Sequence, residues 1–280
     1  MNLPQSGRSC LYNKKANSHN IVCQPSQMIM GQKLSCSVCG GACSLLDVVD
    51  FNKSCIEARG KFLSLSGIPV YYALCSKCGF CFAPELMTWG AEKFKERIYN
   101  DEYVLVDPDY ISVRPLDRAK YLLSTFGNRM HSVKHLDYGG GNGLLAKLLR
   151  QSNWQSVSYD PFVDKNASIE KLGKFDLITA FEIFEHVPDV RDLMSKLRSL
   201  LSPDGLILFS TLLSDGNIRP NQRISWWYAS PRNGHISLFS KNSLAVLAQS
   251  NGFKFANCSN FMHVFFTKIP PWANHIIRVG

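Results

Sequence analysis

The sequence lacks the features that would place it in a membrane or send it across one. No stretch approaches the roughly 18 uninterrupted apolar residues that a spanning helix needs, although 45% of the 280 residues are hydrophobic. Residues 1–30 also lack the charged and then apolar pattern of a secretion signal. We therefore predict no membrane span and expect a cytoplasmic protein.

Runs of basic residues and internal repeats are likewise missing. The formal net charge is +9 at pH 7, which suits a polyanionic partner because the summed charge steers encounters. Lys and Arg are scattered, however, and no basic helix or RNA-binding aromatic pattern accompanies them. A nucleic-acid partner is therefore not favoured, and the basic residues are interpreted as a solvated surface. The oligomeric state is left open.

The chain is long enough for one substantial domain with a smaller appendage. Residues 1–32 are polar and without a structural period, which predicts a disordered segment. Clustered cysteines and frequent turn residues predict a small, β-rich module over residues 33–83. A helical linker over residues 84–108 is expected to lead into the main domain at residues 109–268, with a C-terminal tail at residues 269–280.

Strand and helix patterns alternate through the main domain. This order predicts an α/β, Rossmann-like fold whose sheet is mostly parallel and joined by crossover helices. Before it, residues 99–110 form an acidic, aromatic connection that is a candidate border of the functional site. The predicted strands are 133–138, 156–160, 175–181, 205–211, 253–257 and 261–268, and the predicted helices are 144–150, 190–201 and 242–250.

Several of the ten cysteines occur in two C-x-x-C-G patterns. Paired knuckles of this kind complete a closed tetrahedral zinc site, which is structural because it leaves no open coordination position. Cys43 and Cys81 extend the knuckles and are alternative ligands. Disulfides and a redox dithiol are the weaker interpretations, because no thioredoxin-like unit surrounds a single pair. The predicted zinc ligands are Cys36, Cys39, Cys75 and Cys78.

A glycine-rich turn follows the first strand of the main domain, in the sequence HLDYGGGNG at residues 135–143. Glycines allow positive φ angles and a close approach of a ligand to the backbone. The carboxylate of Asp137 can bind a cationic group, whereas it would disfavour the pyrophosphate of NAD over the helix N-terminus. The turn therefore predicts a cofactor that carries an ammonium group. About 20 residues downstream, Asp160 ends the next strand and can accept both hydroxyls of a ribose.

Four segments together resemble the class I S-adenosylmethionine-dependent methyltransferases: LDYGGGNG, the strand-end Asp160, FDLITAFEIFEH at residues 175–186, and LSPDGLIL at residues 201–208. The resemblance implies that the glycine loop holds the methionine moiety, that Asp160 holds the ribose, and that residues 180–182 border the sulfonium. The implied cofactor-binding residues are Asp137, Gly139, Gly141, Gly143, Asp160, Phe162, Ala180 and Phe181.

The chain departs from this family between Asp160 and Asp176. Only fifteen residues separate them, where the family usually has a helix and a third strand. The residues of the adenine pocket are therefore open. Phe162 is a candidate for stacking on the ring, and a packed core phenylalanine is the alternative.

Two carboxylates and two histidines form a candidate acceptor site. Glu182, Glu185 and His186 lie at i, i+3 and i+4, so a helical turn would project them from one face. His235 comes from an aromatic segment, residues 226–239, that we interpret as a lid. The pattern is similar to the E-x-x-E-H and later His of ubiquinone-pathway O-methyltransferases and small-RNA 2′-O-methyltransferases, which implies a divalent ion such as Mg²⁺ at Glu182, Glu185, His186 and His235.

Without a metal ion, the same groups have other uses. His235 can act as a general base, and we include Glu182 and His186 among the candidate catalytic residues. In the simplest alternative, the four side chains only form hydrogen bonds within their loops.

The resemblance implies methyl transfer from S-adenosylmethionine to a small-molecule or glycan acceptor. Similar zinc knuckles precede some sugar C-methyltransferases, which favours a hydroxyl or carbon of a sugar or polysaccharide intermediate. A metal-assisted O-methyltransferase acting on a small aromatic or RNA hydroxyl is the second hypothesis. The third is a non-catalytic protein that senses S-adenosylmethionine or uses its zinc ribbon as a scaffold.

Overall fold

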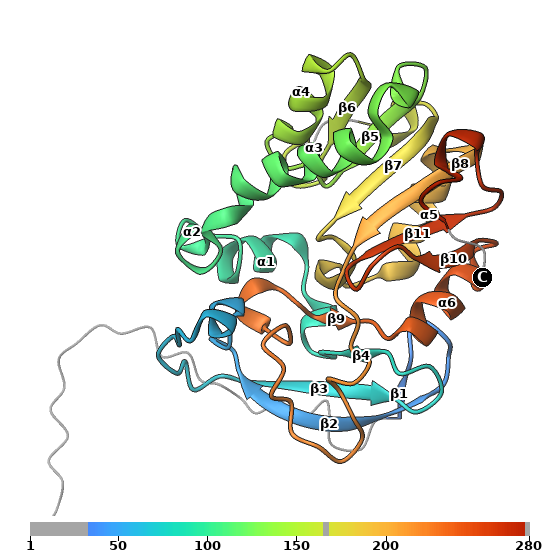
Figure 1. The fold of residues 1–280 in the computed structure, drawn as a ribbon. Helices are drawn as coiled ribbons and strands as arrows, with labels where there is room; N and C mark the ends of the chain where they lie inside the picture. The colour runs from blue at the N-terminus through green and yellow to red at the C-terminus, as the bar shows by residue number, and fades with distance from the viewer. Residues whose placement is uncertain (1–32, 165–167, 278–280) are drawn as a thin grey trace, which may run out of the picture. The chain divides into compact units, whose positions relative to one another are not determined.

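The structure is a computed structural model that describes residues 33–164 and 168–277. The predicted disordered segment, residues 1–32, lies outside the described residues. The described chain forms two sheets (Figure 1), one of six strands in the order β10-β11-β8-β7-β5-β6 and one of five in the order β1-β2-β3-β4-β9. No helix in the described ranges is long and apolar enough to cross a membrane.

The six-stranded sheet is mostly parallel, as predicted. Strands β6, β5, β7 and β8 run parallel to one another, and β11 and β10 join the β8 edge in antiparallel fashion. This arrangement confirms the Rossmann-like α/β fold. The strands are β5 (Lys134–Tyr138), β6 (Gln155–Tyr159), β7 (Phe175–Phe181), β8 (Leu201–Ser210), β10 (Lys254–Asn257) and β11 (Met262–Phe266).

Three helices of the α/β pattern appear where the sequence predicts them. They are α4 (Leu144–Gln151), α5 (Val190–Leu200) and α6 (Lys241–Ser250). The Asp189 side chain caps α5 and the Ser240 side chain caps α6, so each helix begins at a residue whose oxygen accepts from free backbone N–H groups.

The long helix α3 (Val113–Phe126) is absent from the sequence prediction. Its buried residues Ala119, Leu122 and Phe126 recur at helical spacing, which is a signal that was present in the sequence. The short helices α1 (Ala91–Arg97) and α2 (Tyr103–Val106) precede it.

The connection between β6 and β7 is short. Its described residues contain one 3-10 turn, η5 (Ile169–Lys171), in place of a full helix and a third strand. The departure from the family pattern that the sequence indicates is therefore present in the fold.

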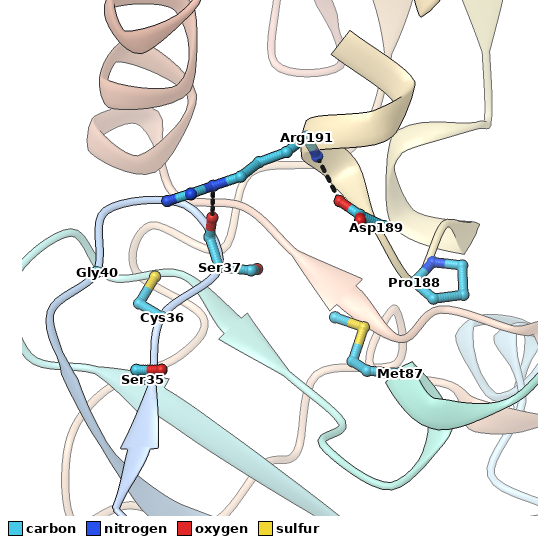
Figure 2. Close-up of a pocket in the computed structure, with 8 residues that line it drawn as sticks. All are labelled: Ser35, Cys36, Ser37, Gly40, Met87, Pro188, Asp189 and Arg191. Atoms are coloured by element: carbon cyan, nitrogen blue, oxygen red, sulfur yellow. Dashed lines mark hydrogen bonds between the residues drawn. The ribbon is translucent and has the colours of Figure 1, made fainter. Parts of the chain in front are cut away.

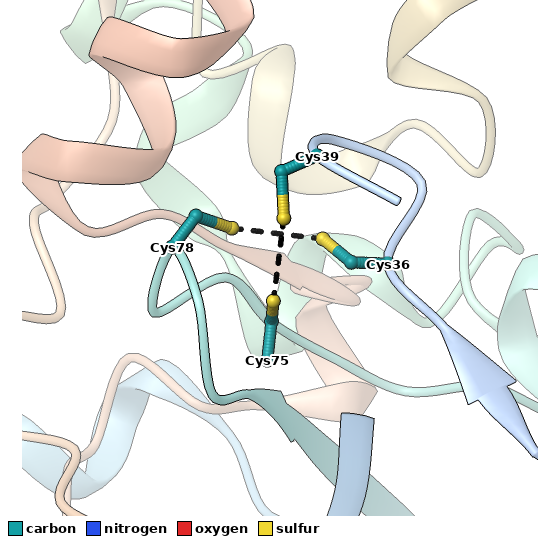
Figure 3. A group of neighbouring side chains, drawn as sticks. All are labelled: Cys36, Cys39, Cys75 and Cys78. Carbon is teal, nitrogen blue, oxygen red and sulfur yellow. Dashed lines mark hydrogen bonds between the residues drawn. The ribbon is translucent and has the colours of Figure 1, made fainter. Parts of the chain in front are cut away.

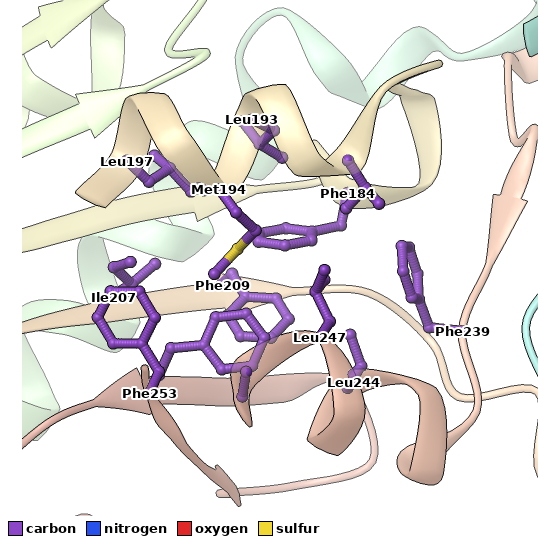
Figure 4. Close-up of a cluster of buried hydrophobic side chains, with 14 of the residues drawn as sticks. Phe184, Leu193, Met194, Leu197, Ile207, Phe209, Phe239, Leu244, Leu247 and Phe253 are labelled. Atoms are coloured by element: carbon purple, nitrogen blue, oxygen red, sulfur yellow. The ribbon is translucent and has the colours of Figure 1, made fainter. Parts of the chain in front are cut away.

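The hydrophobic core continues from the main sheet into the cysteine region. Figure 4 shows Leu193, Met194 and Leu197 of α5 packed near Phe184 and Phe209. The same buried cluster also includes three of the four predicted zinc ligands, Cys36, Cys75 and Cys78. The cysteine region and the α/β region consequently bury apolar surface against each other.

The five-stranded sheet combines two distant parts of the chain. Strand β9 pairs with β4, so residues after β8 complete a sheet that begins in the predicted zinc module. Ile224, Trp226 and Tyr228 share a buried cluster with residues of β3. The division into residues 33–83, 84–108 and 109–268 stays a prediction. The strands are β1 (Leu34–Ser35), β2 (Ala42–Asp50), β3 (Pro69–Cys75), β4 (Cys81–Phe82) and β9 (Ser237–Leu238).

Candidate active site

A cavity of about 1170 Å³ lies at the carboxyl ends of β5, β6 and β7. Ligands of open α/β sheets bind at this edge, because loops and helix N-termini meet there. Gly143 and Ala180 are not among the lining residues: Gly143 is the N-cap residue before α4, and Ala180 is fully buried within β7. Six of the eight predicted cofactor-binding residues do line the cavity, namely Asp137, Gly139, Gly141, Asp160, Phe162 and Phe181.

Two positions of the glycine loop need glycine, because neighbouring side chains lie too close for a Cβ atom. A Cβ at Gly139 would lie 2.1 Å from Ile183 Cδ1, and Gly139 has a φ of 74°. A Cβ at Gly140 would lie 2.4 Å from Asp137 Oδ2 and 2.3 Å from Ser158 Oγ. Neither position tolerates a side chain without movement. Gly140 was absent from the predicted site, although the triple glycine marks it.

Asp137 is a buried acidic residue near the carboxyl end of β5. Only 3% of the residue is exposed, and its carboxylate accepts a hydrogen bond from Thr179 Oγ1 at 3.0 Å. Burial raises the pKa of Asp137 to about 7, and the negative charge of Asp160 adds to this effect. A cationic ligand would stabilise the carboxylate, so the residues fit the ammonium end of S-adenosylmethionine.

Asp160 joins the two loops of the cofactor region. Its Oδ2 accepts from Gly141 N at 2.9 Å and its Oδ1 from Phe162 N at 2.8 Å. Each carboxylate oxygen keeps a further acceptor position, which suits the two hydroxyls of a ribose. Phe162 is 49% exposed, with its ring centroid 5.8 Å from that of Tyr99. The alternative of a packed core phenylalanine is therefore wrong.

Glu182 lies apart from the other predicted metal ligands. Its φ is 54°, which is uncommon for a residue with a side chain. Ser210 Oγ accepts from Glu182 N at 2.9 Å and donates to Glu182 Oε1 at 2.7 Å, and Arg118 Nη2 lies 3.3 Å from the same oxygen. The chain does not continue as a helix through Glu182, so the predicted shared face does not form.

Three of the four residues do come together. One ligand atom each of Glu185, His186 and His235 lies within 4.8 Å of the others. Glu185 is fully buried in η6 (Phe184–His186), where Oε1 accepts from the Tyr228 hydroxyl and Oε2 has no hydrogen-bond partner within residues 33–164 and 168–277. Burial raises the pKa of Glu185 to about 8. A buried, unpaired carboxylate oxygen is costly, and a cation would satisfy it.

The two histidines of this group are held as neutral rings. Burial lowers the pKa of His186 and of His235 to about 3. His186 Nδ1 lies 3.2 Å from the Gly234 carbonyl, and His235 Nδ1 lies 2.8 Å from the Tyr228 carbonyl. Carbonyls only accept, so the contact with Tyr228 O puts the proton of His235 on Nδ1 and leaves Nε2 as an acceptor or ligand atom. The contact with Gly234 O favours the same tautomer for His186, with the Tyr99 hydroxyl 3.1 Å from the same Nδ1.

His235 lies behind His186 with respect to the cavity. His186 lines the cavity, whereas His235 does not and is 5% exposed, and the two ring centroids are 4.8 Å apart. Trp226 and Tyr228 are buried in the cluster of the five-stranded sheet. The prediction that residues 226–239 form a lid over the acceptor is therefore wrong, since none of them lines the cavity.

The aromatic connection before α3 does border the site. Tyr99, Tyr103 and Tyr110 line the cavity, as expected for residues 99–110. Arg114 and Arg118 of α3 also line it, although neither was among the predicted site residues. Their spacing of four residues on one helical face was the available signal.

The four predicted zinc ligands converge. Figure 3 shows the sulfurs of two chain turns pointing toward one another, with Sγ–Sγ distances of 3.6 Å for Cys36–Cys78 and 3.5 Å for Cys39–Cys75. Zinc–sulfur bonds of about 2.3 Å put the sulfurs of a tetrahedron about 3.8 Å apart, so the group fits zinc and not disulfides. Cys43 lies outside the group. The Cys78 thiol lowers the pKa of Cys36 to about 5.

Comparisons with known proteins agree with this fold. The model of a family described as a methyltransferase domain matches residues 92–256, more than half of the chain. The chain therefore belongs to the methyltransferase domain family. Together with the sheet order and the glycine loop, this membership defines a class I S-adenosylmethionine-dependent methyltransferase.

Curated relatives match a smaller region. The ubiquinone biosynthesis O-methyltransferase of Colwellia psychrerythraea is 35% identical over 81 residues, which cover 29% of this chain and 33% of the relative. The enzyme of the same name from Actinobacillus pleuropneumoniae is 29% identical over 113 residues, which cover 30% of this chain and 48% of the relative. The chain thus spans a third to a half of the length of these two relatives.

Solved structures resemble the chain more distantly. An O-methyltransferase family protein from Burkholderia thailandensis matches with a TM-score of 0.47 and 13% identity, over 67% of each chain. Magnesium protoporphyrin IX methyltransferase from Synechocystis matches with a TM-score of 0.38 and 17% identity, over 62% of this chain and 93% of the other.

Proposed function

We propose that this protein transfers the methyl group of S-adenosylmethionine to a hydroxyl of a small acceptor with an aromatic or apolar body. One observation carries the proposal: Asp137, Asp160 and His186 line the same cavity. A cofactor held by the two aspartates therefore shares its cavity with a neutral imidazole. The names of the curated relatives support a hydroxyl as the methylated group.

Different residues along the cavity bind different parts of S-adenosylmethionine in this proposal. Asp137 binds the ammonium group, Asp160 accepts the ribose hydroxyls, and Phe162 covers the adenine. S-adenosylmethionine supplies an electrophilic methyl group on a sulfonium. In-line positioning of the acceptor oxygen then provides much of the rate acceleration.

His186 is the candidate proton acceptor. Its Nε2 has no hydrogen-bond partner among the described residues, and its Nδ1 proton is directed to Gly234 O. As the O–CH₃ bond forms and the S–CH₃ bond breaks, the acceptor hydroxyl passes its proton to His186 Nε2, and S-adenosylhomocysteine leaves. Tyr99, whose hydroxyl lies 3.1 Å from His186 Nδ1, orients the ring.

The cavity walls favour an acceptor with an aromatic or apolar body over a free sugar. Tyr110, Ile111, Phe162 and Val163 are all at least 42% exposed and line the cavity. Exposed apolar side chains that gather at a cavity mark a binding surface. The first hypothesis from the sequence was a sugar or polysaccharide intermediate, and sugars are therefore included among the acceptors to be assayed.

A divalent ion at Glu185, His186 and His235 is the second candidate mechanism. The unpaired Glu185 Oε2 and the two Nε2 atoms form a carboxylate and imidazole set that suits a divalent transition metal. Such an ion lowers the pKa of an acceptor hydroxyl, and His186 would then be a ligand in place of the base. Glu182 would join only by leaving Ser210 and Arg118.

Zinc in the four-cysteine group is the third part of the proposal. Four thiolates leave no open coordination position, so this ion would be structural. The purified protein should contain about one zinc per chain, which the Cys36→Ser and Cys75→Ser changes together would remove. A metal-free and fully folded wild-type protein would contradict this role.

The decisive experiment is radiolabelled methyl transfer. Purified protein with methyl-labelled S-adenosylmethionine is assayed against panels of phenols, prenylated phenols, sugars and RNA. We expect label in a phenolic ether, with more than about a hundredfold loss in His186→Gln. The exposed His131→Gln is the matched control and should keep full activity.

Three other outcomes would decide against parts of the proposal. Label in a sugar would contradict the acceptor class. Tight binding of S-adenosylmethionine without transfer to any acceptor would favour a sensor over an enzyme. Loss of activity on chelation, while zinc stays in the four-cysteine group, would select the divalent-ion mechanism over the imidazole base.

A further inference from the structure

Residues 228–240, here called the bridging segment, connect the five-stranded sheet to the Glu185–His186–His235 group. The Tyr72 hydroxyl of β3 donates to His235 O at 2.7 Å. On the next residue, Ile236 O accepts from Ala83 N at 2.9 Å and Ile236 N donates to Glu185 O at 2.9 Å. The backbone that carries His235 is thus bonded to the sheet on one side and to Glu185 on the other.

The second cysteine knuckle contacts the C-terminal end of the bridging segment, at residues 239 and 240. Strand β4 begins three residues after Cys78 and pairs with β9. Ser240 Oγ donates to Cys78 O at 2.7 Å, and a Cβ at Gly79 would lie 2.9 Å from Ser240 Oγ. The ring centroids of Phe80 and Phe239 are 4.9 Å apart. The knuckle and the segment are therefore packed without space between them.

The first cysteine knuckle contacts helix α5, which follows the segment that carries Glu185 and His186. Figure 2 shows Arg191, in the first turn of α5, reaching the carbonyl of Ser37 between Cys36 and Cys39. Helix α5 starts four residues after η6, which carries Glu185 and His186. The four-cysteine group consequently contacts both chain segments that bring the three residues together.

The ring centroids of His235 and of His186, the candidate proton acceptor, lie 4.8 Å apart. We propose that Tyr72 and the four-cysteine group position His235, and through this ring contact His186, so that a metal ion among the cysteines is required for methyl transfer but not for binding of S-adenosylmethionine. This inference rests on the proposed function. Strands β1, β4 and β9 have two residues each, too few to stay paired without a staple. Asp137 instead lies in β5 and Asp160 directly follows β6, and these two strands pair with each other in the six-stranded sheet.

A single hydroxyl tests the positioning role of Tyr72. Tyr72→Phe keeps the buried ring and removes the bond to His235 O. We expect kcat to fall about tenfold, while KM for the acceptor and the affinity for S-adenosylmethionine stay unchanged. Tyr71→Phe is the matched control, since Tyr71 is the neighbour on β3 and points to the opposite face. Equal kcat in Tyr72→Phe and wild type would overturn the role.

Removal of the metal ion tests, without any acceptor, whether the four-cysteine group holds the bridging segment but not the site for S-adenosylmethionine. In wild-type protein, zinc in the four cysteines is exchanged for Co²⁺, which reports its thiolate ligands by absorption, and is then removed by chelation. We expect hydrogen exchange of the Ile236 amide to accelerate at least tenfold, while calorimetric affinity for S-adenosylmethionine stays within twofold. Unchanged exchange at Ile236, or a parallel loss of S-adenosylmethionine binding, would overturn the inference.

This design separates the inference from the proposed function. If the wild-type protein transfers no methyl group to any acceptor, the proposed function fails. The exchange and calorimetry measurements then still decide whether the cysteine group holds the bridging segment.

Discussion

The two halves of the cavity are assembled in different ways. In the cofactor half, Gly141 donates to Asp160 across 19 residues, within one strand-helix-strand unit. In the half around His186, Tyr99 bonds to His186 across 87 residues, and Tyr72 bonds to His235 across 163 residues. Local chain geometry therefore builds the first half, whereas the second half depends on packing between distant segments.

The largest expected difference between the two halves of the cavity is in Glu185→Gln, which should lower methyl transfer without changing cofactor binding. The change keeps the shape of the side chain but replaces one carboxyl oxygen, in a group whose ligand atoms lie within 4.8 Å of those of His186 and His235, by an amide nitrogen. We expect methyl transfer to fall at least about a hundredfold, with unchanged calorimetric affinity for S-adenosylmethionine. Glu170→Gln, on the exposed η5, is the control. Weaker cofactor binding in Glu185→Gln would show that the halves are not independent.

Gly140→Ala tests the cofactor half. The added Cβ would lie 2.4 Å from Asp137 Oδ2, so the carboxylate or the loop must move. Overpacking of this kind costs about 2 kcal/mol, which is roughly a thirtyfold loss of affinity for S-adenosylmethionine. Gly90→Ala is the control, because a Cβ there meets no atom within 4 Å. Equal affinities in calorimetry would mean that the loop does not approach the ligand.

The pH dependence of cofactor binding should report Asp137. Its pKa is raised to about 7 in the free protein, and the ammonium group requires the ionised form. Affinity should therefore weaken as pH falls below about 7, by about tenfold between pH 7 and pH 6 at most. Asp137→Asn should bind weakly with no such dependence. A flat wild-type profile would assign the ammonium contact to another group.

The last expected effect is on stability against acid and not on methyl transfer. Burial lowers the pKa of His135, His186 and His235 to about 3, below the usual value of 6.5 in an unfolded chain. The unfolded state binds more protons between these values, so the free energy of unfolding should decrease as pH falls from 6.5 toward 3. Urea unfolding at pH 7 and pH 5 measures the decrease. His235→Gln should show a smaller decrease than wild type.

Local patterns predicted the fold well. The bounds of β7 agree with the predicted residues 175–181, because a continuous apolar run leaves little choice of register. The four cysteines also converge as predicted, since each pair lies in a tight turn of its own. Helix α3 was not predicted, although the helical spacing of its apolar residues is present in the sequence. The lid was predicted because residues 226–239 are rich in aromatic side chains, most of which are buried in the structure and none of which lines the cavity.

What the sequence determined by itself is the cofactor half: Asp137, the glycines and Asp160 lie on one short unit whose geometry follows from backbone sterics and hydrophobic period. Tertiary structure alone decided that Glu182 bonds to Arg118 while Glu185 and His186 meet His235. The physical reason is that β9 pairs with β4, a strand far from it along the chain, and no local pattern encodes the partner of a two-residue strand.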